Sequence, residues 1–522
     1  MTDDLETGSP RPAARGTRSR TGNYLRALAS GYVVAAATVV VGLWLTPFTL
    51  RYLDRERFAV FTLAGDVMAW LTLLDLGFVS VLNSRAAQIT GRPDRLELDT
   101  LASTTFFVQL ATAAAVLIAG TALVWWFPWF FPLSAGVRQE ATNVVALMVL
   151  SSAVTVVSQT FSTLLFAHQQ AHVDNLLRLG LVAIRAALTV ALLMAGVGLV
   201  SLAWANLAAT AAMAATAVFR VRKYLPALSI SLRHFRWAVL KGSGRIGTWF
   251  SLGGIAGVLI VNLDRIVTAK LVSVETVTTL ALTGKVYVLA WTFIQLATGM
   301  ARPALAQLVG SGRLDRARQT YEELAALSGG IAITLAACLW AGNGHFVRWW
   351  VGPQNYGGAA LDALLALNVI VHAWVLPNRA MLAASLASVP EHNLSRFAEG
   401  ALNVALSVTL GQAWGVKGVV AATAIAGVAS SCWYLPRLTA RFFGVGWLQL
   451  HRSHAARLAL LALAAASAAV IGRVVAVDLR DLPGAAVGSA VALAVCAPAL
   501  WFVALNKTTR SRALAVVRGA QG

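Results

Sequence analysis

Arg185 and Lys285 are charged residues inside long apolar stretches of this 522-residue sequence. Arg185 lies near the middle of the stretch 174–196, and Lys285 lies in the first half of the stretch 277–300. A cation at the centre of a bilayer costs roughly 2.5–3.5 kcal/mol on insertion scales, so it faces a partner or a polar cavity. The two cations therefore indicate either ion pairs between helices or a cavity that binds an anionic substrate.

Three further basic residues are candidates for the same cavity. Arg178 lies about two helical turns before Arg185 and within about 20° of it around the helix. Arg26 begins the first apolar stretch, where it either reaches the lipid headgroups or guards the inner mouth of a cavity. Arg85 lies at the inner end of the second stretch. Pro47, late in the first stretch, removes a backbone hydrogen bond and predicts a bend in that helix.

Five other residues are candidates for ion coupling or gating. Asp75 and Glu399 are the candidate protonation sites, and Asn403 follows Glu399 by one turn on the same helix face. Asp264 and Arg265 are adjacent at the outer end of their stretch, and adjacent residues do not face each other on a helix, so each needs its own partner. For Asp264 the competing interpretation is a structural hydrogen bond or ion pair.

Motifs for catalysis and cofactor binding are missing from the sequence. There is no GxxxxGK[ST] phosphate loop, no HExxH motif and no Cys/His cluster with metal-ligand spacing. Cys338, Cys432 and Cys496 lie in apolar stretches and are expected to be core residues. The longest outer loop, 346–358, carries Arg348 as its charge and is too short for a catalytic loop. We therefore predict no enzymatic activity, no metal and no cofactor.

Helices that cross a membrane must position these residues. Hydrophobic residues make up 58% of the sequence, charged residues 12%, and the mean hydropathy is +0.70. A helix of about 20 apolar residues spans a bilayer, and helices satisfy their own backbone polar groups there. We predict an all-α polytopic membrane protein with about fourteen spans. The spans are 27–50, 58–82, 100–127, 141–166, 174–196, 199–219, 242–266, 277–300, 324–347, 360–386, 394–414, 416–436, 455–475 and 484–505.

The formal net charge of +20 follows the predicted topology. With the N-terminus in the cytoplasm, the inner loops hold about three times as many Lys and Arg residues as the outer loops, as the positive-inside rule requires. In this assignment Arg379 and Arg396 count with the inner loop between spans ten and eleven, and both termini are cytoplasmic. The charge therefore argues against nucleic acid as a partner.

The longest inner connection divides the predicted chain into two lobes. It runs over 220–241 and contains six basic residues and no acidic ones, which suits an anchor on anionic lipids. The predicted organisation is a disordered cytoplasmic tail (1–22), an N-lobe of six helices (23–219), the basic linker (220–241), a C-lobe of six helices (242–440), two further helices (441–505) and a basic cytoplasmic tail (506–522).

A set of loose motifs in a fixed order resembles the Wzx-type polysaccharide (O-antigen) flippases of the multidrug/oligosaccharidyl-lipid/polysaccharide exporter superfamily. The motifs are Pro47-Phe48-Thr49-Leu50-Arg51-Tyr52-Leu53, Leu73-Leu74-Asp75-Leu76-Gly77, Asn83-Ser84-Arg85-Ala86-Ala87, Asn262-Leu263-Asp264-Arg265-Ile266-Val267, Gly312-Arg313-Leu314-Asp315-Arg316, Trp349-Trp350-Val351-Gly352-Pro353 and Trp414-Gly415-Val416-Lys417-Gly418-Val419. The resemblance implies a V-shaped pair of six-helix lobes around a cationic cavity, with two extra C-terminal helices.

The resemblance also implies the substrate, an undecaprenyl-pyrophosphate-linked oligosaccharide that crosses the bacterial inner membrane by alternating access. The expected partners are this lipid-linked oligosaccharide and membrane lipids, with the polysaccharide polymerase and chain-length machinery as candidates, and the protein is expected to be a monomer. Two alternatives remain open: an ion-coupled drug antiporter of the same superfamily, which favours acidic and aromatic cavity walls, and a membrane glycosyltransferase or polymerase.

Overall fold

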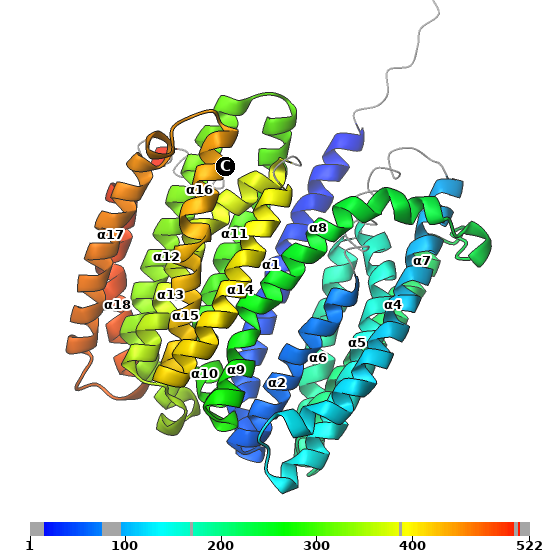
Figure 1. The fold of residues 1–522 in the computed structure, drawn as a ribbon, viewed down its shortest axis with the longest axis horizontal. Coiled ribbons are helices and arrows are strands. Elements are labelled where there is room, and N and C mark those ends of the chain that lie inside the picture. The colour runs from blue at the N-terminus through cyan, green and yellow to red at the C-terminus, as the bar shows by residue number, and fades with distance from the viewer. Residues whose placement is uncertain (1–14, 76–94, 168–170, 386–388, 506–509, 512–522) are drawn as a thin grey trace, which may run out of the picture.

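The protein is built from long helices in the part of the chain that the structure describes. This structure, a computed structural model, describes residues 15–75, 95–167, 171–385, 389–505 and 510–511. Most of these residues lie in α-helices that run roughly parallel to one another (Figure 1). The predicted all-α fold is confirmed.

The first helices of the chain pack on one another as a bundle, which we call the first bundle. Its elements are α1 (Arg15–Tyr52), α2 (Arg55–Leu71), the 3-10 helix η1 (Thr72–Asp75), α4 (Arg95–Phe130), α5 (Ala135–Ala167), α6 (Ala171–Met194) and α7 (Val200–Tyr224). Helix α5 packs on α4 and α7, and α6 packs on α1 and α7.

The second bundle follows after a short connection. It consists of η2 (Leu232–His234), α8 (Trp237–Val261), α9 (Leu263–Leu271), α10 (Val274–Thr283), α11 (Lys285–Gly310), α12 (Leu314–Val351), η3 (Pro353–Asn355), α13 (Ala359–Ala384), α14 (Val389–Trp414), α15 (Val416–Ala429) and α16 (Ser431–Phe442). The last elements, α17 (Trp447–Val475), α18 (Asp481–Ala499) and the π-helix η5 (Leu500–Ala504), pack against α12.

The connection between the bundles is shorter than the predicted linker, because α7 extends to Tyr224 and α8 begins at Trp237. Its backbone is tied to α4. The amide of Ser229 donates to the Asp99 carboxylate at 3.0 Å, and the amide of Arg236 donates to the Thr104 hydroxyl at 3.1 Å. The segment is therefore fixed on the first bundle by hydrogen bonds.

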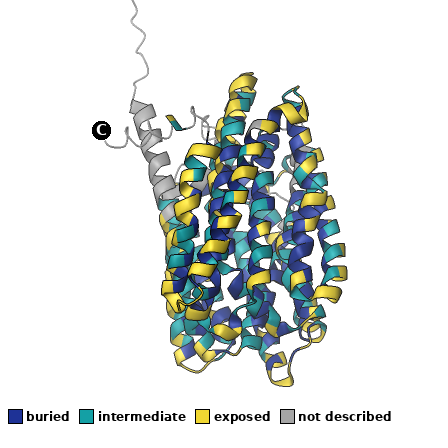
Figure 2. Cartoon of the chain, turned by 90° about the vertical axis from the view of Figure 1, so that its left-hand side faces the viewer, coloured by how far each residue is buried: buried dark blue, intermediate teal, exposed yellow. Residues whose placement is uncertain are grey.

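The outer faces of the helices are apolar, as a membrane requires. Trp125 is 75% exposed and Ile118 is 74% exposed, although both are large hydrophobic side chains. Figure 2 shows exposed residues along the outside of the bundles and buried residues between the helices. Exposed apolar surface on this scale marks contact with lipid rather than water. The chain is a multi-pass membrane protein.

Among the residues that the structure describes, ten helices are long and apolar enough to cross a membrane, and two bent helix pairs raise the number to twelve. The two other predicted spans, 58–82 and 394–414, correspond to α2 and α14. Helix α2 has 17 residues before η1, and α14 carries Glu391, Arg396 and Glu399. The predicted number of about fourteen is reached when these two helices also cross.

The two bent pairs lie at the end of the molecule opposite the start of α1. We call this end the lower end and the other the upper end, as they are drawn in Figure 1. The axis bends by 41° between α8 and α9 and by 53° between α10 and α11. The bends occur at Asn262 and Gly284, so Arg265 and Lys285 each follow a break in a membrane helix.

Gly418 allows α15 to lie directly on the backbone of α14. A Cβ at this position would lie 1.9 Å from the backbone oxygen of Leu410, which cannot move aside without shifting α14. We expect Gly418→Ala to destabilise the fold by about 1–3 kcal/mol, measured as a lower melting temperature of the purified protein in detergent. Gly299→Ala is the control, because nothing lies within 4 Å of its Cβ position. Equal melting temperatures of the two variants would contradict the close approach.

Candidate functional site

Arg185, Lys285 and Arg265 bring three cations from both bundles into one region. Arg185 lies in α6 of the first bundle, whereas Lys285 begins α11 of the second. The positive charges of Arg265 and Arg185 both act on Lys285. Within the described part of the chain, neither Arg185 nor Lys285 has an ion-pair partner, and both are half-buried. The region therefore holds excess positive charge between the bundles.

Arg265, by contrast, pairs with an acid of the opposite bundle. Its Nε and Nη2 atoms donate to the two carboxylate oxygens of Asp66 in α2 at 2.7 and 2.6 Å. Asn262, at the break between α8 and α9, also donates to Asp66 at 2.9 Å. Asp66 is only 3% exposed. This bidentate pair joins the two bundles beside the unpaired cations.

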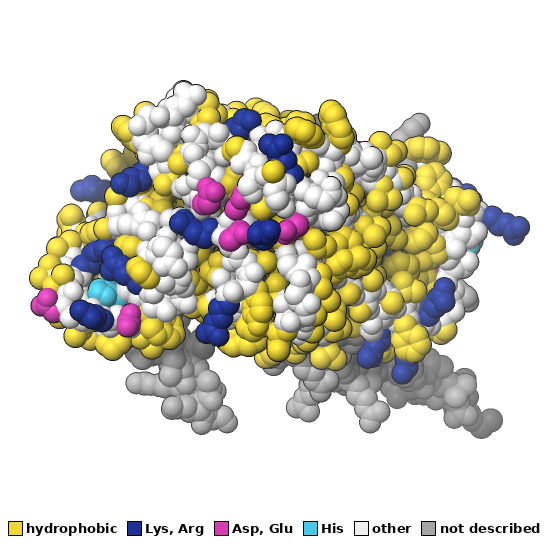
Figure 3. Space-filling view, turned by 90° about the horizontal axis from the view of Figure 1, so that it is seen from below, with side chains coloured by type: hydrophobic (Ala, Val, Ile, Leu, Met, Phe, Trp, Pro, Cys, Tyr) yellow, Lys and Arg dark blue, Asp and Glu magenta, His cyan; other side chains and the backbone are white. Residues whose placement is uncertain are grey.

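Hydrogen bonds between α2 and α10 close the same gap at the lower end. Arg55 Nη2 donates to Thr279 Oγ1 at 2.5 Å and to the backbone oxygen of Glu275 at 3.4 Å. Thr278 Oγ1 donates to the backbone oxygen of Arg55 at 2.7 Å. Figure 3 shows acidic and basic side chains side by side near the middle of this face. The lower ends of the bundles are therefore held together by polar contacts.

Pro47 contributes to this closure through the backbone. Because proline has no N–H, it leaves the carbonyl of Leu43, four residues earlier, without its helical donor. The indole Nε1 of Trp350 in α12 donates to this carbonyl at 2.7 Å. Helix α1 continues through Pro47 to Tyr52. The bend predicted at Pro47 stays a prediction, but the proline has a defined effect, since it frees an acceptor for the second bundle.

Asp264 is held by neutral donors inside the second bundle. Thr423 Oγ1 of α15 donates to Asp264 Oδ2 at 2.8 Å, and Asn403 Nδ2 of α14 lies 3.4 Å from Asp264 Oδ1. Ser407, one turn after Asn403, lies 3.4 Å from the Asn403 amide oxygen. The adjacent residues Asp264 and Arg265 thus have separate partners on opposite sides, as the sequence predicts.

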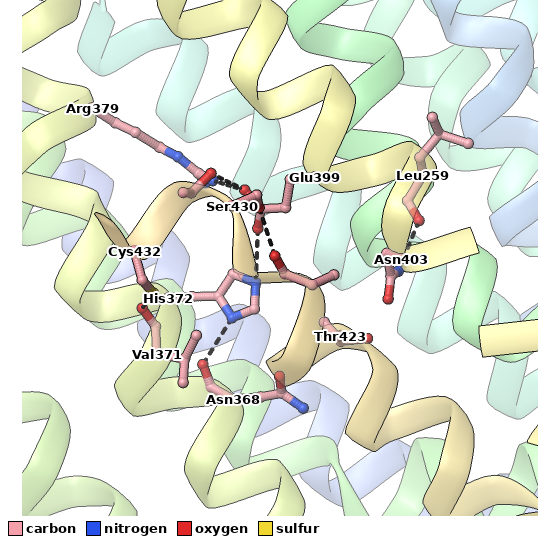
Figure 4. A network of polar contacts seen from close by, with 12 residues as sticks. Leu259, Asn368, Val371, His372, Arg379, Glu399, Asn403, Thr423, Ser430 and Cys432 are labelled. Atoms are coloured by element: carbon pink, nitrogen blue, oxygen red, sulfur yellow. Dashed lines mark hydrogen bonds and ion pairs between the residues drawn. The ribbon is translucent and has the colours of Figure 1, made fainter. Parts of the chain in front are cut away.

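Glu399 has charged partners and does not share one with Asn403. Arg379 Nη2 of α13 donates to Glu399 Oε2 at 2.9 Å (Figure 4). The hydroxyl of Ser431 donates to the same oxygen. His372 Nε2 lies 3.5 Å from Glu399 Oε1. Glu399 is therefore part of a network of charged and polar side chains from several helices.

The tautomer of His372 follows from its contact with the backbone of α13. Its Nδ1 lies 2.9 Å from the backbone oxygen of Asn368, an atom that only accepts, so Nδ1 carries a proton. A neutral ring would then present a lone pair on Nε2 to the Glu399 carboxylate. His372 Nε2 and Glu399 Oε1 therefore face each other at 3.5 Å beside the Arg379–Glu399 ion pair.

Two cations that the sequence analysis assigned to a loop lie inside helices, which corrects that assignment. Arg379 is in α13 and is 8% exposed, and Arg396 is in α14. The burial of Arg379 is tolerated because Glu399 neutralises its charge. The sequence did contain a signal for this burial, because Arg379 lies several residues inside the predicted span 360–386.

Of the other predicted site residues, the structure describes the side chain of Arg178. Arg178 is exposed on α6. The backbones of Arg26 and Asp75 lie in α1 and η1, but their side chains are outside the described part of the structure, and Arg85 lies wholly outside the described residues.

Several solved structures share this fold. An inward-facing conformation of a multidrug resistance MATE family transporter of the MOP superfamily is 14% identical, with a TM-score of 0.64 over 78% of this chain and 94% of that chain. A MOP superfamily transporter from Pyrococcus furiosus is 14% identical, with a TM-score of 0.61 over 80% and 96%. The lipid II flippase MurJ in an inward closed conformation is 14% identical, with a TM-score of 0.59 over 90% and 98%. Identities this low show the fold alone.

No curated protein matches the sequence. The family described as "Polysaccharide biosynthesis protein" matches residues 51–355, which is more than half of the chain. The matched region contains Asp66, Arg185, Arg265 and Lys285. The chain therefore belongs to the polysaccharide biosynthesis protein family, as its sequence motifs predict.

Proposed function

We propose that the protein is a flippase that moves an undecaprenyl-pyrophosphate-linked oligosaccharide from the cytoplasmic to the outer leaflet of the bacterial inner membrane. The observation that carries the proposal is the pair of half-buried cations, Arg185 and Lys285, which have no ion-pair partner in the described part of the chain. They come from opposite bundles and suit a multiply charged anion. Family membership supports a polysaccharide precursor as the cargo, and the MATE and MurJ folds support transport rather than catalysis.

Alternating access would use the contacts between the bundles. In this proposal both termini and the upper end are cytoplasmic, so the hydrogen bonds at the lower end close the outer side. The diphosphate enters the space between the bundles from the cytoplasm. It needs cationic partners there, because its passage through hydrocarbon without partners is prohibitive. The bundles then separate at the lower end and release the lipid outward. A monomer suffices for this cycle, and the polymerase that extends the glycan is a candidate partner.

Ion coupling is assigned to two acids of the second bundle. Glu399 is one candidate, because a proton bound there would alter the charge next to Arg379. Asp264 is the other, because its hydrogen-bond partners Thr423 and Asn403 are neutral. Asp75 remains a predicted third site.

Purified protein in liposomes is expected to move a fluorescent undecaprenyl-pyrophosphate sugar between leaflets. Lys285→Glu should slow this movement, since it replaces a cation beside the phosphates by an anion. The readout is the fraction of fluorescence that a membrane-impermeant quencher reaches over time, and a neutral lipid of equal chain length is the control. Equal movement of the neutral lipid, or export of cationic dyes without movement of the glycolipid, would favour the drug antiporter.

A further inference from the structure

Arg396 is a half-buried cation with no ion-pair partner in the described part of the second bundle. Its guanidinium rests against α8, where a Cβ on Gly257 would lie 2.9 Å from Nη2. Its Nε is buried and has no hydrogen-bond partner among the described residues. One turn earlier, the side chain of Asn393 rests on Gly253 in the same way. The two glycines leave space for two polar side chains of α14 and so fix the position of the guanidinium.

The charges around Arg396 are mostly positive. Arg302 in α11 and Arg379 in α13 both repel it, and Glu399 opposes them. The carboxylate of Glu399, however, is already held by Arg379 at 2.9 Å. His392 is 7% exposed, its Nδ1 has no partner among the described residues, and the same three arginines act on it. Burying uncompensated positive charge is costly, so a site of this kind is expected to receive an anion.

This group of side chains is distant from the cations between the bundles. Lys285 begins α11 and Arg302 lies near its end, which separates them by about 25 Å along the helix axis. One diphosphate cannot contact both. Helix α11 packs on α12 and α13, whereas α8 packs on α14. Arg302 and Arg396 therefore come from two different parts of the second bundle, and the charge of Arg302 acts on Arg396.

We infer that Arg396, Arg302 and His392 form a second oxyanion-binding site, which takes a carboxylate or phosphate group of the transported glycolipid. The inference rests on the proposed function for the identity of this cargo. Guanidinium groups bind carboxylate and phosphate with the same bidentate geometry, so the chemistry recognised is the oxyanion. Its source is either an acidic sugar of the glycan, bound while the diphosphate contacts Arg185 and Lys285, or the diphosphate itself on its way to these cations.

Three soluble probes test the site on the purified full-length protein in nanodiscs by calorimetry. They are trigalacturonate, its neutral counterpart maltotriose, and inorganic diphosphate. Arg396→Gln should weaken trigalacturonate binding by about tenfold or more, because a charge-assisted contact is lost, and should leave maltotriose unchanged. Arg396→Lys keeps the charge and should retain most of the affinity. Lys285→Gln removes one cation from the group between the bundles. It should weaken the binding of diphosphate but not the binding of trigalacturonate.

The outcomes separate the two sources and the two proposals. If Arg396→Gln weakens diphosphate binding as strongly as Lys285→Gln does and leaves trigalacturonate binding unchanged, the oxyanion is the diphosphate of the glycolipid. Arg302→Gln changes an exposed residue and supplies a second variant should Arg396→Gln misfold. Unchanged affinity for both anions in a correctly folded variant would overturn the site. Anion binding that depends on Arg396, in a protein that moves no glycolipid in liposomes, would overturn the proposed function but not the site.

Discussion

Arg185→Ala is expected to reduce transport of the lipid-linked substrate by about 10- to 100-fold, the loss expected for one charged hydrogen bond worth about 1.5–3 kcal/mol. The guanidinium lies half-buried in α6 and has no ion-pair partner in the described residues, so its removal leaves no described acid unpaired. Protein abundance in the membrane should therefore stay normal. The measurement is glycolipid movement in liposomes at matched protein content.

Arg222→Ala serves as the control for Arg185→Ala. Arg222 is an exposed cation in the last turn of α7, at the upper end. It has the same charge but lies outside the group formed by Arg185, Lys285 and Arg265, so transport should change little. If Arg185→Ala instead lowers abundance, and removal of an acidic partner restores it, Arg185 is half of a structural ion pair and the proposed anion contact is wrong.

Arg265→Gln is expected to shift the protein toward an arrangement that is open at the lower end. Removing one partner of a buried ion pair costs about 3–5 kcal/mol, because Asp66 is left charged and unpaired. This cost falls on the closed arrangement, in which Asp66 is 3% exposed. Since 1.4 kcal/mol is about a tenfold change in an equilibrium constant, the ratio of closed to open molecules should fall by at least about 100-fold. Transport should fall as well, because the cycle needs closed and open arrangements of similar free energy.

Electron-spin distances between labels at Arg51 and Val272 measure this shift. Both residues are exposed at the lower end, one on each bundle, and the three native cysteines are replaced by alanine. The distance should lengthen in Arg265→Gln, and the double variant with Asp66→Asn should recover part of the closed population. Glu140→Gln is the matched control, because it breaks the Arg57–Glu140 pair within the first bundle. Equal distance distributions in Arg265→Gln and Glu140→Gln would show that the Asp66–Arg265 pair does not hold the bundles together.

The pairing of Asp66 with Arg265 illustrates what sequence patterns could not supply. These residues are about 200 positions apart, and no helical periodicity relates a position on α2 to one on α9. The sequence analysis recognised that Arg265 needed a distant partner but could not name it. The same limit applies to Glu399, for which the partners Arg379 and Ser431 come from two other helices.

The sequence by itself determined the all-helical membrane fold, the family and the two unpaired cations, because each depends on local properties. Twenty apolar residues in a row must form a helix in lipid, and a charge within them is visible in any one segment. Tertiary structure alone decided which helix ends meet, that Pro47 frees an acceptor for Trp350, and that Arg379 and Arg396 lie inside helices rather than in a loop. These features depend on how helices pack in three dimensions, and a buried charge is stable only with the neighbours that packing provides.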